Sequence, residues 1–264
     1  MDLLLSFFLF GTLSVMLAGA GAIFTEQLGL PAAAGTTLTL ILSVVTVMFG
    51  LSGIIRANII VVPVMISLGL LVSLPEINPG KVLAVLDNFS PAAQTAAPNW
   101  LLAAGLYLTF NLALSVPVLA PLGSEIRSGR ILICGGLLGG TLLGILALVI
   151  NLALLNAYPA SSGYQIPMLL VAKKSSPMLL HAYIFVLWAE IFTTIIGNVF
   201  GLGARLAELT GFSYRKTILP VMAGALLLSQ AGFARLVTHL YPLFGYFAIV
   251  FILCLLRSSF SKNG

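Results

Sequence analysis

The chain has 264 residues, of which 60% are hydrophobic and only 7% are charged, and its mean hydropathy is +1.14. A soluble domain of this length needs far more charge on its surface, so the composition excludes a soluble globular protein and indicates an integral membrane protein. The formal net charge of +5 requires no nucleic-acid partner, and the lipid bilayer is the expected partner of the surface.

Apolar runs of roughly 20 residues, long enough to cross the hydrocarbon core as helices, recur along almost the whole sequence. Lipid satisfies no backbone hydrogen bonds, and the runs lack period-two alternation, so helices are predicted rather than barrel strands. We expect an all-α, polytopic membrane helix bundle of about eight transmembrane helices, which forms a single transmembrane domain over residues 1–264. The expected spans are Leu3–Thr25, Pro31–Gly50, Ala57–Leu74, Trp100–Ala120, Ile131–Asn156, Met178–Gly203, Thr217–Gln230 and Leu240–Leu256.

An even number of spans places both termini on the same side of the membrane. The terminal side then carries eight lysines and arginines and the opposite side four, out of 12. The positive-inside rule therefore predicts a multi-pass protein of the cell membrane with both termini in the cytoplasm. The apolar start resembles a secretory signal, but Met1 and Asp2 carry no positive charge and the apolar run continues through Phe24, so we expect a membrane span there.

Small residues narrow the middle of the first span. Gly19 and Gly21 alternate with alanines there, which leaves space for another helix or for a ligand. Packing is the more frequent use of such a stretch in membrane helices. Gly19 and Gly21 are nevertheless candidate substrate-binding residues.

Two segments between spans are long enough to have structure of their own. Pro75–Pro98 contains Val82 and Leu83 in an apolar stretch flanked by charges, which predicts a short amphipathic helix in the membrane interface. Ala157–Pro177 is predicted to be either a cap over a vestibule or an ordered interfacial linker.

The fourth span combines a polar face with a proline. Tyr107, Asn111 and Ser115 recur every four residues and so share one face, which makes them candidate substrate-binding residues. Pro117 clashes with the carbonyl of Ala113 and donates no hydrogen bond, so we expect the helix to open between them. The alternative is a simple kink whose freed carbonyl is bonded by a serine or asparagine side chain.

The fifth span carries a strip of glycines. Gly136, Gly140 and Gly144 are spaced four residues apart, with Gly135 and Gly139 beside them. This spacing predicts that another helix packs closely against the fifth span. It gives no information about chemistry.

The sixth span has the strongest functional signal. Glu190, Thr194 and Asn198 share one face by their four-residue spacing, and Thr193 lies on the adjoining face. A carboxylate at this depth costs at least about 2–3 kcal/mol unless it is protonated, paired or wet, so such residues mark ion or substrate pathways. We therefore predict Glu190, Thr193, Thr194 and Asn198 as ion-coupling residues, although a threonine hydroxyl alone commonly bonds to its own helix.

Signatures of other reaction classes are missing from the sequence. It contains no HExxH, CxxC, GxSxG or nucleotide-binding glycine loop, and its two histidines, His181 and His239, lie near span ends without acidic neighbours. We expect no enzyme activity, no catalytic residue and no cofactor. Coupling to Na⁺ or H⁺ is the ion chemistry that we expect.

Four stretches of this sequence resemble the uncharacterised YkvI-type membrane proteins, which are distant relatives of the amino acid/polyamine/organocation transporters with the LeuT-type fold. The resembling stretches are Met16–Ala22, Ala120–Glu125, Phe192–Leu202 and Leu240–Tyr246. The resemblance implies a LeuT-like core that lacks the first two helices, because this chain begins at what resembles the third helix of the fold. It also implies that Thr193 and Thr194 are sodium ligands, although their partner carbonyls on the first helix would be absent.

The residues and the resemblance together predict a transporter-like protein. It would take up or exchange a small organic solute by alternating access with cation coupling. The alternative is a non-transporting, truncated or structural membrane protein that assembles with other helices. A homo-oligomer, or a longer form that supplies the missing helices, would provide the partner in either case.

Overall fold

The computed structural model describes residues 2–49, 52–88, 97–126 and 128–262, and every regular element in these ranges is helical. The elements in chain order are α1 (Asp2–Leu28), α2 (Ala32–Phe49), α3 (Ser52–Ser73), η1 (Leu74–Glu76), α4 (Pro79–Asp87), α5 (Trp100–Glu125), α6 (Gly129–Ala157), η2 (Ala160–Gly163), α7 (Pro167–Ser175), α8 (Pro177–Thr210), α9 (Tyr214–Ser229) and α10 (Phe233–Lys262).

Each of the eight expected spans coincides with one of these helices over most of its length. The expected all-α class is therefore confirmed. Five described helices are long and apolar enough to cross a membrane, namely α1, α3, α6, α8 and α10, and α2 and α5 contain shorter apolar segments. The count of eight transmembrane helices stays a prediction.

Two expected boundaries are wrong by seven residues: α8 continues to Thr210 instead of ending at Gly203, and the last span starts earlier than expected. We expected it to begin at Leu240, but α10 already begins at Phe233, so Pro242 lies inside the helix. Pro63 and Pro220 likewise lie inside α3 and α9. Proline loses only one backbone hydrogen bond, and neighbouring groups in a packed membrane helix can replace it, so it does not have to end the helix.

The expected opening of the fourth span is also wrong. α5 continues as one α-helix from Trp100 to Glu125, through Ala113 and residue 117. The local polar side chains instead bond to carbonyls of their own helix. The Asn111 amide donates to the Tyr107 carbonyl at 2.7 Å, and the Ser115 hydroxyl donates to the Leu112 carbonyl at 2.8 Å.

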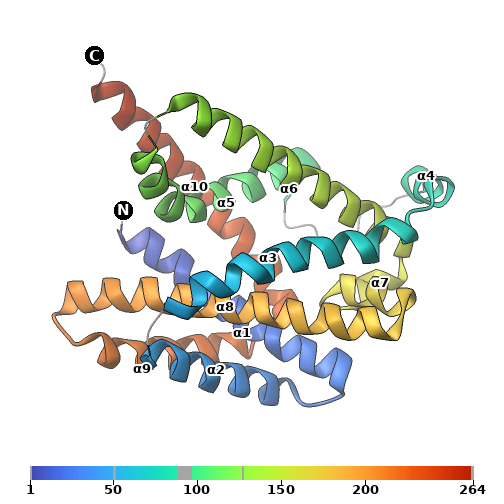
Figure 1. Cartoon of the computed structure of the whole chain (residues 1–264), viewed down its shortest axis with the longest axis horizontal. Coiled ribbons are helices and arrows are strands. Elements are labelled where there is room, and N and C mark those ends of the chain that lie inside the picture. The colour runs from blue at the N-terminus through green and yellow to red at the C-terminus, as the bar shows by residue number, and fades with distance from the viewer. Residues whose placement is uncertain (1, 50–51, 89–96, 127, 263–264) are drawn as a thin grey trace.

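Helix α1 is the centre of the structure. It packs against α2, α8 and α9 on one side and against α10 on the other, and α10 in turn carries α5 (Figure 1). A core of buried apolar side chains, including Leu13, Leu17, Ile195 and Met222, fills the space between α1, α8 and α9. On the opposite flank, α3 lies between α8 and α6. The central pair α1 and α8 thus supports two separate flanks.

The two long connections have structure, as expected. α4 lies within the described part of the first connection and buries Val82, while residues 89–96 lie outside the described ranges. In the second connection α7 buries Met168, Leu169, Val171 and Ala172 against α3, α6 and α8. The second connection is therefore a packed cap over one end of the bundle.

That cap is tied to α1 by a carboxylate. The two oxygens of Glu26, near the end of α1, accept the backbone N–H groups of Gln165 and Ile166 directly before α7. These N–H groups lie at the start of a helix, where a negative charge is favourable. Glu26 therefore joins the end of α1 to the start of α7.

The glycine strip of α6 has no helix against it in the described structure. A Cβ atom built at Gly136, Gly140 or Gly144 meets nothing within 4 Å among the described residues, and the same holds for Gly135 and Gly139. α6 contacts α3, α4 and α7 instead, and no residue in its most apolar stretch is buried. The close packing that we expected on this strip is therefore absent from the described chain.

Candidate functional site

Helix α8 supports the polar face that the sequence singles out. Ser176 caps its start by accepting the Leu179 N–H at 3.2 Å, Pro177 occupies its first turn, and Gly211 ends it with a φ of 72°. Between these signals the helix is long, and its buried side packs on α1 and α9 through residues such as Ile195 and Val199. The ends of α8 and its buried apolar side fix the direction of the polar face.

Glu190 lies deep within α8 and is half-buried. No hydrogen bond or ion pair reaches its carboxylate from any described residue; the described ion pair on α8 joins Arg205 and Glu208 at 2.7 Å. Gly197 lies seven residues later and so on nearly the same face, and a Cβ built there meets nothing within 4 Å. The Glu190 face of α8 is therefore open in the described structure.

The other predicted coupling residues differ in their surroundings. Thr193 is buried, and its hydroxyl donates to the Glu190 backbone carbonyl at 3.2 Å, while Thr194 is half-buried. The side-chain nitrogen of Asn198 is buried without a hydrogen-bond partner among the described residues. The Thr193 hydroxyl keeps its acceptor lone pairs after donating one bond, so this bond is compatible with sodium binding. A sodium role for Thr193 and Thr194 stays a prediction.

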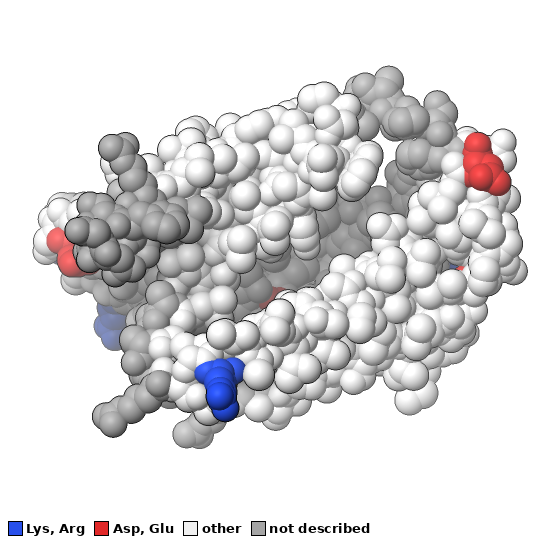
Figure 2. All heavy atoms as spheres, turned by 90° about the horizontal axis from the view of Figure 1, so that it is seen from above, with Lys and Arg blue, Asp and Glu red and all other residues white. Residues whose placement is uncertain are grey.

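A space-filling view shows a long hollow across one face of the molecule, with part of an acidic side chain visible inside it (Figure 2). Most of the other acidic and basic side chains visible in this view lie toward the two ends of the molecule. Charged groups at the ends and an apolar middle are the distribution expected for a protein that crosses a bilayer.

The polar face of α5 is not brought against the polar face of α8. Tyr107 and Asn111 are exposed and Ser115 is half-buried, and the extensive contacts of α5 are with α10. α1 lies between α5 and α8 in the packing order. The structure therefore places the two predicted groups of site residues on different sides of α1.

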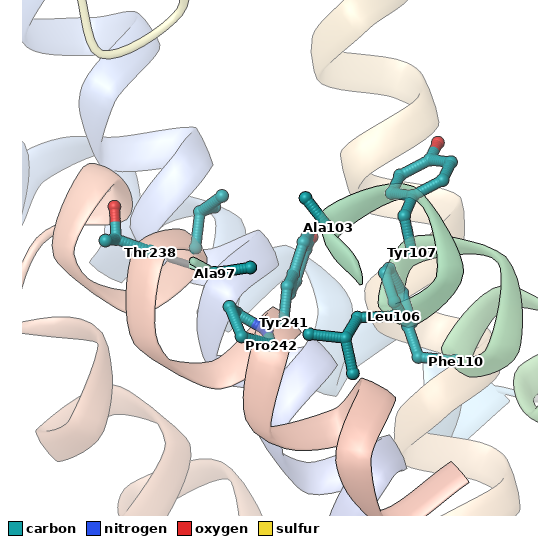
Figure 3. A pocket seen from close by; sticks show the side chains of 9 residues that line it. Ala97, Ala103, Leu106, Tyr107, Phe110, Thr238, Tyr241 and Pro242 are labelled. Atoms are coloured by element: carbon teal, nitrogen blue, oxygen red, sulfur yellow. The ribbon is translucent and has the colours of Figure 1, made fainter. Parts of the chain in front are cut away.

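A pocket of about 310 Å³ lies between the start of α5 and α10. Figure 3 shows Leu106 and Phe110 of α5 facing Tyr241 and Pro242 of α10, with Tyr107 at the rim and its hydroxyl directed away from them. The Phe110 and Tyr241 rings lie 4.9 Å apart between centroids. The volume of this pocket is at the lower limit for a small-molecule site, and the pocket is lined mainly by apolar and aromatic side chains.

The two candidate glycines of α1, Gly19 and Gly21, are packing positions. A Cβ built at Gly21 lies 2.9 Å from the Thr36 methyl carbon and 3.0 Å from the Ala32 carbonyl oxygen, both on α2. At Gly19 it lies 3.3 Å from the Phe233 ring and 3.4 Å from Ile191. These contacts correspond to the packing alternative for both glycines, and their part in substrate binding stays a prediction.

Sequence reasoning missed Thr12, which is 8% exposed in α1 and whose hydroxyl oxygen is buried without a partner in the described structure. The available signal was a polar residue in an apolar run, two turns before Gly19. No group of three or more His, Cys, Asp or Glu side chains in the described ranges is arranged to hold a metal ion. The site is thus built mainly from hydroxyl and amide groups around one carboxylate.

Comparison with known proteins gives two relatives from Bacillus subtilis (strain 168). The uncharacterised membrane protein YkvI is 35% identical over 253 residues, which cover 95% of this chain and 71% of YkvI. The uncharacterised protein YyaD is 26% identical over 255 residues, which cover 97% of this chain and 73% of YyaD. No protein-family model and no solved structure matches the chain. The extent and identity of the first alignment show that this chain belongs to the YkvI family of membrane proteins.

Proposed function

We propose that this chain is a transporter-like membrane protein that moves a small organic solute by alternating access and couples the movement to Na⁺ or H⁺. One observation carries the proposal: a half-buried carboxylate, Glu190, which has no hydrogen-bond or ion-pair partner among the described residues, lies far from both ends of an apolar helix. Retaining such a group at membrane depth is costly, and ion or proton pathways are its usual role. Thr193 and Thr194 are the proposed sodium ligands.

The proposal includes a LeuT-like core whose first two helices are not in this chain. Roughly three tenths of YkvI lies outside its alignment with this chain, which is enough sequence for additional membrane helices. The open face around Glu190 and Gly197 is where such helices, or lipid, would lie. We further propose a multi-pass arrangement in the cell membrane with both termini in the cytoplasm.

The test uses the full chain reconstituted in proteoliposomes, with an imposed Na⁺ or proton gradient and a panel of radiolabelled amino acids, amines and carboxylic acids. Glu190→Gln should lose ion-dependent uptake, because the amide keeps the shape of the side chain but neither carries charge nor exchanges a proton at neutral pH. Glu208→Gln is the matched control, because Glu208 lies on the same helix, is exposed and pairs with Arg205.

Both variants should keep the elution volume and melting temperature of the wild type. Ion-dependent uptake that survives unchanged in Glu190→Gln would overturn the coupling role. The same uptake profile in wild type and empty liposomes, across the whole panel, would refute transport by this chain.

A second function is supported by a different observation. The open glycine strip of α6, around Gly140, favours a non-transporting membrane protein that assembles with other helices or with a second copy of itself. In this alternative Glu190 would be a structural group, and its replacement by glutamine would leave assembly unchanged.

A further inference from the structure

The antiparallel packing of α1 and α8 fixes which residues face each other. A Cβ built at Gly19 lies 3.4 Å from Ile191, and a Cβ built at Gly201 lies 3.4 Å from Leu9. The two contacts belong to one register, because Leu9 lies ten residues before Gly19 on α1 and Gly201 lies ten residues after Ile191 on α8. Thr12 of α1 and Asn198 of α8 are therefore at the same level.

The helical repeat also places these two residues on facing sides. Thr12 lies seven residues before Gly19, and Asn198 lies seven residues after Ile191. Seven residues are almost two complete helical turns, so each residue points nearly as its reference residue does. Thr12 consequently points toward α8 at the level of Asn198, just as Gly19 points toward Ile191 of α8 and the neighbouring Phe233 of α10.

Both facing residues bury a polar atom without a partner. The Thr12 hydroxyl oxygen and the Asn198 side-chain nitrogen have no hydrogen bond within the described chain. Only 8% of the surface of Thr12 is exposed. A buried polar atom without a partner is commonly explained by a bound water, ion or ligand, and the described chain holds seven such side-chain atoms, of which these two lie at one level of one helix interface. Two such atoms at one level of one helix interface imply a shared partner.

We infer that Thr12 and Asn198 together bind an oxygen acceptor, a carboxylate or carbonyl oxygen, of the transported solute. The amide nitrogen carries two N–H donors and the hydroxyl carries one O–H donor, so both can donate to a single oxygen. The unpartnered atom of Asn198 is the amide nitrogen, which is a donor and cannot ligate a cation. This assignment rests on the proposed function, and it moves Asn198 from ion coupling to solute binding.

Thr12 and Asn198 lie about two helical turns from Glu190, the proposed coupling residue. Asn198 is one turn from Thr194 and two turns from Glu190 along α8, a rise of about 12 Å from Glu190 to Asn198 at 1.5 Å per residue. The oxygen-binding pair and the carboxylate therefore lie at different depths. A solute oxygen can be bound at Thr12 and Asn198 while Glu190 exchanges a cation or proton.

The test measures the melting temperature of the purified full chain in detergent, followed by intrinsic tryptophan fluorescence. The probes are sodium propionate, propionamide and n-propylammonium chloride, at matched ionic strength. The variants are Thr12→Val and Asn198→Leu, and the control is Thr46→Val, whose hydroxyl donates to the Leu42 carbonyl of its own helix at 2.8 Å. Propionate should raise the melting temperature of the wild type and of Thr46→Val, and propylammonium should not.

Thr12→Val and Asn198→Leu should lose this response, and without probe they should melt no lower than the wild type, because each replaces an unpartnered polar atom by an apolar one. A response to propionamide as well identifies a carbonyl oxygen as sufficient, and a response to propionate alone identifies a carboxylate.

Two results with the probes would overturn the inference: an unchanged melting temperature of the wild type with both propionate and propionamide, or a response that persists in both variants. A third result would be a non-additive loss of stability in the double variant, which would show a direct bond between the two side chains. Glu190-dependent uptake with either of the first two results would leave the proposed function standing and remove only this site.

Discussion

At Gly245 the backbone of α10 lies directly against that of α5. A Cβ built at Gly245 of α10 lies 2.6 Å from the Leu106 Cβ atom and 2.7 Å from the Leu106 carbonyl oxygen of α5. Non-bonded carbon atoms prefer about 3.5–4.0 Å, so Gly245→Ala must separate the two helices by roughly 1 Å at this point. A backbone obstacle cannot move aside as a flexible side chain can.

The magnitude follows from two costs. Overpacking of this kind removes about 1–3 kcal/mol of the free energy of unfolding. The separation also weakens the bond from the Thr109 hydroxyl to the Gly245 carbonyl, which measures 3.2 Å and whose loss costs about 0.5–1.5 kcal/mol. We expect a total loss of about 1.5–4.5 kcal/mol for Gly245→Ala, before any gain from alanine's better helix propensity.

Gly140→Ala on α6 is the matched control, provided that the protein is kept monomeric by excess detergent, because a Cβ there meets nothing within 4 Å in the described structure. Both substitutions gain the same helix propensity, about 0.5–1 kcal/mol, so the difference between the variants isolates the packing term. Reversible unfolding in mixed detergent micelles, followed by circular dichroism, measures both free energies. Equal stability of Gly245→Ala and Gly140→Ala would refute the reasoning.

Two further predictions concern topology and assembly. A cysteine at Lys173 should react with an impermeant thiol reagent added outside whole cells and a cysteine at Arg215 should not, because the charge distribution places them on opposite sides; the reverse pattern would overturn the orientation. If α6 pairs with α6 of a second copy, Gly140→Cys in a background with both native cysteines replaced by serine should cross-link into dimers under oxidation. Leu71→Cys on α3, where the native side chain is also exposed, should not cross-link, and monomers at both positions would exclude that interface.

The positions of the helices could largely be predicted from the sequence, because apolar run length is a local property. The behaviour of the prolines could not. We read Pro242 as a helix start and residue 117 as a break, yet both positions lie inside continuous helices. A proline's effect depends on whether neighbouring groups stabilise the turn around it, and the sequence of one helix does not contain that information.

The candidate site could likewise be predicted only in part from the sequence. The face formed by Glu190, Thr194 and Asn198 follows from spacing within α8, and the structure keeps it on one helix as expected. Thr12 could not be found in this way, because its importance comes from Asn198, which lies far away in the sequence and is brought opposite by packing. The separation of the α5 and α8 polar faces by α1 could not be predicted from spacing either, because it depends on the order of the helices in space.

The bond network of Glu26 restricts how the molecule can change shape. Its carboxylate ties α1 to the start of α7, and α7 is buried against α3, α6 and α8. A rearrangement that opens this end of the protein therefore has two routes. Either α7 travels with α1 as one rigid unit, so that the cap slides with the helix that carries Thr12, or the carboxylate releases both N–H groups and the cap swings away alone. In the first route, displacement of the cap would be transmitted along α1 to the level of Thr12.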